Sequence, residues 1–136
     1  MKNDNCIFCK IANGEIPSNT IYEDEALRVF LDLGPATKGH ALIVPKDHYA
    51  NLFEMPEDLL SKVIHTAKKV GQTQMDRLNA DGFNLVQNNN EAAGQTVFHF
   101  HMHLIPRYKD DNQKILWNPT SPSSEELVEV KEILTK

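Results

Sequence analysis

Positive charge, long apolar runs and cysteine are all scarce in this sequence. Its 136 residues include 14 lysines and arginines against 19 aspartates and glutamates, so the formal net charge is −5. A protein this acidic is poorly suited to non-specific binding of nucleic acids or anionic membranes. No apolar run approaches the roughly 20 residues of a membrane-spanning helix, and the N-terminus, MKNDNCIFCK, turns polar too early for a signal peptide. We therefore expect a cytoplasmic protein with no membrane or nucleic-acid partner.

Two cysteines are too few for a disulfide framework. In a reducing compartment, Cys6 and Cys9 would be metal ligands, redox thiols or ordinary core residues. The length fits a single domain, residues 1–136, which can bury about two-thirds of the surface that the unfolded chain exposes. A segment rich in Pro and Ser, NPTSPSS, lies within a C-terminal extension of about residues 108–136.

Apolar periodicity predicts several short strands and one long helix. Apolar residues recur at helical spacing over residues 55–79, with Pro56 in the expected first turn. Ser123 and Glu126 have the spacing of a capping box, which predicts a short C-terminal helix. Strands are expected in TIYEDEALRVFLDL (as two strands around an acidic turn), HALIVPK, GFNLVQ and VFHFHMHLIP. The short connections favour the α+β class, with an antiparallel sheet of about five strands.

Three of the six histidines occur at every second position of VFHFHMHLIP. On a strand, His99, His101 and His103 would share one face, roughly 6.6–7 Å apart, while Phe98 and Phe100 would face the core. Such a row could be a solvated strand face or a three-histidine metal site. It could also be a set of neutral imidazoles that act as nucleophile and proton carrier at phosphorus.

The loop before this strand, NNNEAAGQT, favours phosphate chemistry. Gly94 permits close approach to the backbone, and Gln95 and Thr96 offer side-chain donors. Free backbone N–H groups in such a loop can also hold an anion. Alone, these residues would indicate an ordinary turn, but beside three aligned histidines they favour a phosphate site.

HFHMHLI resembles the signature of the histidine triad (HIT) family, and the similarity extends from about Cys6 to Arg107. The upstream segment is similar to the Hint branch, and the long segment after the triad resembles its bacterial, zinc-containing type. The resemblance implies a homodimer with two sheets joined into one.

It also implies a hydrolase or transferase that cleaves at the α-phosphate of a purine nucleotide through a covalent nucleotidyl-histidine. Nucleoside phosphoramidates are the expected substrates. Diadenosine polyphosphates are the alternative, and a nucleotide- or zinc-binding interaction module with weak turnover is the rival.

The resemblance also implies roles for individual residues. His101 matches the nucleophile, His103 matches the residue beside the leaving group, and His40 matches an outer histidine that supports the triad. The matching substrate-binding residues are Asp32 for the ribose, Phe8, Ile16 and Leu33 for the base, and Gln95 and Thr96 for the phosphate. Asn88 matches a further substrate-binding asparagine, seven residues before that glutamine. Without the resemblance, Phe8, Ile16 and Leu33 would be interpreted as core residues. Asp32 would be interpreted as an acid that caps a turn.

The sequence CIFC admits three interpretations: a redox motif, two unrelated core cysteines, or half of a zinc site. The N-terminus lacks the βαβ context of a thioredoxin-like motif. Zinc-containing HIT relatives use the set that corresponds here to Cys6, Cys9, His48 and His99. The resemblance therefore implies a structural zinc, with four protein ligands that leave no open position for an activated water.

Overall fold

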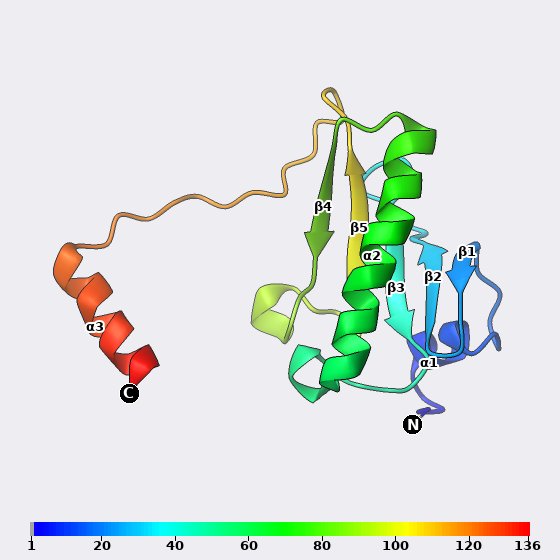
Figure 1. The fold of residues 1–136 in the computed structure, drawn as a ribbon, viewed down its shortest axis with the longest axis horizontal. Coiled ribbons are helices and arrows are strands. Elements are labelled where there is room, and N and C mark those ends of the chain that lie inside the picture. Colours follow the sequence, from blue (N-terminus) through cyan, green and yellow to red (C-terminus); the bar gives the residue numbers. More distant parts are fainter. Residues whose placement is uncertain (1) are drawn as a thin grey trace.

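The computed structural model describes residues 2–136 and contains one five-stranded sheet, in which every neighbouring pair of strands is antiparallel (Figure 1). The strand order is β1-β2-β3-β5-β4. This architecture confirms the predicted α+β class and the predicted number of strands. The elements are α1 (Ile7–Ala12), β1 (Thr20–Glu23), β2 (Leu27–Leu31), β3 (Ala41–Pro45), η1 (Leu52–Glu54), α2 (Glu57–Leu78), β4 (Gly82–Val86), η2 (Glu91–Ala93), β5 (Met102–Arg107) and α3 (Ser124–Thr135).

The long helix α2 packs against one face of the sheet and forms the main core. Its buried stripe includes Val63, Ala67 and Val70, which cluster with strand residues such as Ile43 and Leu104. Pro56 is the N-cap, one position before the predicted first turn, and the helix ends at Asn79 in a left-handed conformation (φ 53°). Gly71 lets α2 approach β4, because a Cβ atom there would lie 3.0 Å from the Phe83 ring.

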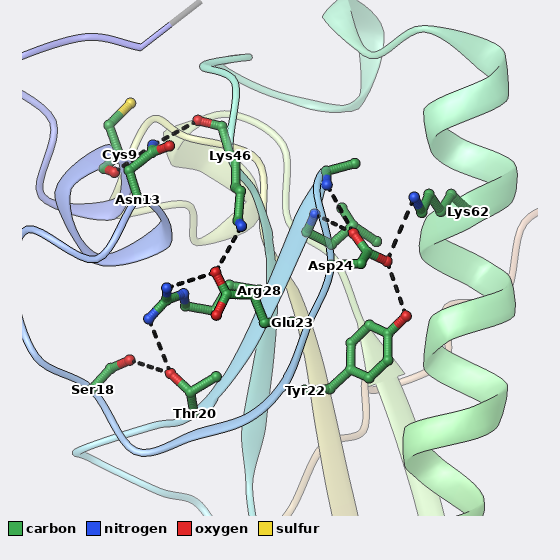
Figure 2. A network of polar contacts seen from close by, with 12 residues as sticks. Cys9, Asn13, Ser18, Thr20, Tyr22, Glu23, Asp24, Arg28, Lys46 and Lys62 are labelled. Carbon is green, nitrogen blue, oxygen red and sulfur yellow. Dashed lines mark hydrogen bonds and ion pairs between the residues drawn. The ribbon is translucent and has the colours of Figure 1, made fainter.

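The short helix α1 packs on the opposite face of the sheet. Ala12 joins Phe30, Leu42 and Val44 in a second buried cluster, so β3 is buried on both faces, as its continuous apolar run predicts. The Asn13 side chain donates hydrogen bonds to the Cys9 and Lys46 carbonyls, at 2.8 and 3.0 Å (Figure 2). These contacts fix the end of α1 against the end of β3.

The β1–β2 hairpin is tied to α2 by Asp24 (Figure 2). Its carboxylate accepts hydrogen bonds from the backbone N–H groups of Ala26 and Leu27 in the turn and from the Tyr22 hydroxyl. Lys62 of α2 lies 3.5 Å from the same carboxylate. The acidic turn predicted between these strands therefore also anchors the helix.

The histidine-bearing strand is shorter than predicted. β5 begins at Met102, so His99 and His101 lie in an irregular segment before it, and Phe98 is 51% exposed instead of facing the core. Pairing with β3 starts at Ile43 opposite Met102. One reason is Pro45 at the end of β3, which has no N–H group to extend the ladder.

The C-terminal extension leaves the top of β5 as an extended chain and ends in α3, well away from the sheet (Figure 1). The predicted capping box is confirmed. Ser123 Oγ accepts from the Glu126 N–H, and Glu126 Oε1 accepts from the Ser123 N–H, both at 3.2 Å. Over residues 2–136, no helix combines the length and apolar character needed to cross a bilayer.

Candidate active site and metal centre

His101 is held in one tautomer by the backbone. Its Nδ1 lies 2.8 Å from the His99 carbonyl oxygen, which can only accept, so Nδ1 carries the proton and Nε2 carries a lone pair. Burial lowers the pKa of His101, although the bond to the His99 carbonyl opposes that effect. The side chain therefore presents an unprotonated nitrogen near neutral pH.

A second series of hydrogen bonds, from Ala36 through His40 to His103, determines the tautomers of these two histidines. The Ala36 N–H donates to His40 Nδ1 at 2.9 Å, so the proton of neutral His40 is on Nε2. His40 Nε2 lies 2.9 Å from His103 Nδ1, which must accept. His103 therefore carries its proton on Nε2. Burial is the main cause that lowers the pKa of His103 to about 4 and also lowers the pKa of His40.

Asp32 closes this series. Its Oδ2 lies 3.5 Å from His40 Nε2, and its Oδ1 accepts from the Gly34 N–H at 2.8 Å. Asp32, His40 and His103 are close enough to share a metal ion. We interpret them as a hydrogen-bond chain instead, because the Ala36 N–H leaves Nε2 of neutral His40 as a donor without a lone pair for a cation.

A cavity of about 430 Å³ opens beside these histidines. Phe8 forms part of its wall, with its ring centroid 5.0 Å from that of His101. Leu33 also lines the cavity but is 91% exposed. The predicted site residues in its lining are Phe8, Ile16, Asp32, Leu33, Thr96, His101 and His103. An apolar slot with a carboxylate and two imidazoles at its edge suits a flat base joined to a polar, anionic group.

Two predicted substrate-binding residues lie outside this lining. Gln95 is only 2% exposed, and its amide donates to the Ala50 and Val97 carbonyls while its Oε1 accepts from the Asn90 N–H. Asn88 is partly buried in the same loop. In this structure Gln95 organises the loop, so the phosphate role of Gln95 and the substrate-binding role of Asn88 stay predictions.

The sequence interpretation missed other residues of the cavity. Ser18 and Asn19 lie on the chain before β1, where no motif distinguishes them from an ordinary polar loop. Phe30 and Leu42 also line it, and the signal for them was available, since each belongs to a strand buried on both faces.

A second cluster lies behind the cavity and contains the four predicted metal ligands. The ligand atoms of Cys6, Cys9, His48 and His99 all lie within 4.8 Å of one another. His99 Nδ1 is 3.3 Å from Cys6 Sγ and 3.4 Å from Cys9 Sγ, and His48 Nδ1 is 3.3 Å from Cys9 Sγ. Tetrahedral zinc with ordinary bond lengths requires sulfur–nitrogen edges of about 3.5 Å, so the donor set fits that ion.

The surroundings of His99 support the same conclusion. Its Nε2 lies 2.8 Å from the Pro45 carbonyl, so this nitrogen carries the proton and Nδ1 points its lone pair at the sulfurs. Burial lowers the pKa of His99 to about 4 and raises the pKa of the Cys9 thiol. A cation among these groups would stabilise the thiolate form.

Comparison with known proteins matches the HIT domain family to residues 13–110. An uncharacterized HIT-like protein of Methanocaldococcus jannaschii is 50% identical over 110 residues, which are 81% of this chain and 84% of that protein. An adenosine 5'-monophosphoramidase of Candida albicans is 44% identical over 110 residues, covering 78% of this chain and 72% of that protein.

Solved structures agree in fold. A crystal structure of a Streptococcus mutans protein superposes with a TM-score of 0.92 at 40% identity and covers 98% of this chain and 85% of its own. A zinc-bound histidine triad family protein from Mycobacterium smegmatis superposes with a TM-score of 0.77 at 33% identity, over 94% of this chain and 96% of that one.

Proposed function

The chain belongs to the HIT family of nucleotide hydrolases, and we propose that it cleaves purine nucleoside phosphoramidates at the α-phosphate through a covalent nucleotidyl-His101. One observation carries the proposal. The His99 carbonyl holds the proton of His101 on Nδ1, and this leaves the Nε2 lone pair free beside a nucleotide-sized cavity. A neutral imidazole in this state is a competent nucleophile near pH 7.

The reaction has two displacements at phosphorus. His101 Nε2 forms a bond to the α-phosphorus, the bond from phosphorus to the leaving nitrogen breaks, and that nitrogen takes a proton from solvent. Water then attacks the same phosphorus, the bond to Nε2 breaks, and one proton returns to solvent. His103 donates from Nε2 to the leaving nitrogen or to a phosphate oxygen throughout. His40 keeps it in this tautomer and is a positioning residue.

The substrate class rests on the lining of the cavity and on a relative. Phe8, Ile16 and Leu33 offer apolar surface to a base, and Asp32 offers carboxylate oxygens to ribose hydroxyls. The Candida albicans relative is an adenosine 5'-monophosphoramidase. We assign this chain a purine nucleoside phosphoramidate on the same grounds. Thr96 at the cavity, with Gln95 and Asn88 after a shift of their loop, would contact the phosphate.

Turnover of adenosine 5'-phosphoramidate tests the activity. We expect release of AMP, and denaturation at alkaline pH during turnover, which preserves the acid-labile P–N bond, should trap one AMP on His101, detectable by mass spectrometry of the peptides. Faster turnover of diadenosine polyphosphates would reassign the leaving group within the same mechanism. Nucleotide binding without turnover of either substrate would instead indicate an interaction module.

We propose that Cys6, Cys9, His48 and His99 hold one structural zinc ion. The zinc-bound relative from Mycobacterium smegmatis and the fit of the donor set support this assignment. Zinc here would cross-link α1, the segment after β3 and the segment before β5. With four protein ligands it would have no position for a reacting water. A reducing, cytoplasmic compartment would keep both cysteines available as ligands.

We also propose that the protein is a homodimer in which β4 pairs with β4 of a second copy. β4 is an edge strand with an uncovered hydrogen-bonding side, and edges of this kind pair readily. Leu85 of β4 is half-exposed, and beside it a shallow apolar hollow includes Phe83 and Ile64. An interface here would cover these residues and join the two sheets.

A further inference from the structure

The apolar face of α3 is uncovered. Every residue of the helix is exposed, and its side-chain hydrogen bonds join residues of the same segment. Leu127, Val130 and Leu134 recur at helical spacing and form one stripe, with Ile133 beside it. The preceding arm, which we define as residues 112–123, adds Leu116 and Trp117, both 82% exposed. This amount of unpaired apolar surface indicates an interaction site.

A helix of this length does not hold its position by itself. Isolated helices shorter than about 12–15 residues are marginal in water, and α3 has 12 residues. The superposition on the Streptococcus mutans crystal structure covers 98% of this chain, too much to omit α3. A helix this short, standing away from the sheet (Figure 1), therefore needs further contacts to stay folded.

A groove with an apolar floor lies on the α2 side of the sheet. We define the α2–β1 groove as the cavity of about 590 Å³ between α2 and the outer strands β1 and β2. Figure 1 shows β1 and β2 at the sheet edge beyond α2. Its floor is apolar and includes Tyr22, Leu31, Val70 and Leu78.

The charges of the groove and the helix are opposite. Lys38, Lys69 and Arg77 line the groove, and its described lining contains no carboxylate. Helix α3 carries four glutamates and one lysine. An apolar floor with cations along it suits an amphipathic acidic helix.

The direction of the arm favours a second copy over the same chain. Gln113 fixes the start of the arm to its own domain, because its side chain donates to the Ala36 carbonyl at 2.8 Å and its carbonyl accepts from Arg107 at 2.7 Å. From there the arm passes β4 and carries α3 to the side of the sheet opposite β1 (Figure 1). A copy joined at β4 would lie on that side.

We propose that α3 of each chain docks in the α2–β1 groove of a second copy, so that two arms are exchanged across the dimer. This inference goes beyond the proposed activity and does not depend on it. It does require association of two chains. The exchange would cover the apolar stripe, neutralise Lys69 and Arg77 with glutamates, and add a second interface to the pairing at β4.

Site-directed cross-linking of the full-length chain tests the exchange. Thr73→Cys places a thiol in the groove, and Val130→Cys places one on the apolar stripe. The two single variants, carrying different tags, are mixed, allowed to exchange subunits and oxidised. We expect about tenfold more covalent heterodimer than from Asp76→Cys mixed with Val130→Cys, because docking raises the effective concentration of the thiols to about the millimolar range. Asp76 is exposed on the same helix and lies outside the groove lining. The parent chain corrects for reactions of Cys6 and Cys9.

The doubly substituted chain, Thr73→Cys with Val130→Cys, separates the remaining outcomes. Cross-linked dimers support the exchange. A cross-link within single chains would show that α3 folds back onto its own groove, and this would overturn the proposal. Equal yields from the groove and control variants would also overturn it, because α3 would then have no preference for the groove.

Charge reversal gives an independent measurement. Lys69→Glu with Arg77→Glu should lower the yield of the cross-link, and adding Glu129→Lys with Glu132→Lys in the partner should restore it. Unchanged yields in the reversed groove would show that charge does not guide the helix. The turnover of these variants measures the proposed activity separately, since neither cation lies in the catalytic cavity.

Discussion

At the scale of the residue, the chemistry depends on where single protons sit. A carbonyl oxygen at His99 and an N–H group at Ala36 determine the tautomers of His101, His40 and His103. Both are backbone groups, so the side chains that face the cavity receive their chemical roles from main-chain geometry. The spacing of the histidines indicated that they work together but did not assign the proton positions.

Removal of the nucleophile should abolish turnover and preserve binding. For His101→Ala we expect kcat to fall by at least about a thousandfold, because the bond to phosphorus forms only on the reaction path. The dissociation constant for AMP should change little. The matched control is His65→Ala, since His65 is an exposed histidine on α2 far along the chain from the triad. Near-normal kcat in His101→Ala would rule out a covalent intermediate on this residue.

Asp32 should distinguish ribonucleotides from analogues without hydroxyls. For Asp32→Ala we expect AMP to bind about tenfold to a hundredfold more weakly, because its hydroxyls lose a charged acceptor. Binding of 2',3'-dideoxy-AMP should be nearly unchanged. Asp32→Asn is the control, because the amide oxygen can still accept from the Gly34 N–H. Equal losses for both ligands in titration calorimetry would make Asp32 a loop-capping residue.

At the scale of the element, the metal cluster joins parts that the sheet leaves separate. Cys6 is the N-cap of α1, His48 follows β3, and His99 precedes β5. Besides the cluster, α1 is tied to the end of β3 by the bonds of Asn13. A zinc ion would make one rigid unit of the three segments. It would also hold the His99 carbonyl in place as the hydrogen-bond acceptor of His101 Nδ1.

Loss of one sulfur ligand should therefore lower stability before it lowers activity. For Cys9→Ser we expect zinc to be lost and Tm to fall by at least about 5 °C, since each kcal/mol shifts Tm by a few degrees in a domain of this size. Protein that remains folded should keep some turnover. Elemental analysis of the wild type, purified without added metal, should find close to one zinc per chain.

Two results would contradict this assignment. Wild-type protein without zinc, whose Cys6 and Cys9 alkylate as fast as free thiols, would leave the cluster without a metal role. A Cys9→Ser variant that stays folded but has no activity, and regains activity only when zinc is added, would make the metal part of the chemistry.

At the scale of the whole molecule, buried neutral histidines make stability depend on pH. His103 faces His40, His101 and Asp32, and burial lowers its pKa to about 4 in the folded state, below its ordinary value of about 6.5. Between these two values the unfolded chain binds more protons than the folded chain. The free energy of unfolding should therefore fall as the pH is lowered from about 6.5 to about 4.

Urea unfolding of the wild type and His103→Asn across this window measures the effect. We expect the midpoint to fall less steeply with decreasing pH in the variant, because an amide does not titrate. Zinc release at acid pH affects both proteins and cancels in the comparison. Parallel curves for the two proteins would show that His103 does not contribute to the pH dependence.

Local rules were enough to predict most of the elements. The α2 helix, the strands of the sheet and the capping box at Ser123 follow from periodicity, turns and caps, which act between residues close in the chain. The family signature likewise indicated His101 and the cysteine–histidine set. The elements could be predicted because the patterns behind them act within short stretches of sequence, whereas the roles of His101 and of the cysteine–histidine set stay predictions.

Other features were decided only by tertiary structure. β5 begins at Met102, where its pairing with β3 starts opposite Ile43, a partner more than 50 positions away in the chain. Gln95 is buried by its bond to the distant Ala50 carbonyl, although its sequence position indicated a phosphate ligand. The proton position of His103 depends on its contact with His40, 63 residues away. Periodicity states which face a residue takes, but burial, hydrogen-bond partners and tautomers depend on which distant groups the fold brings against it.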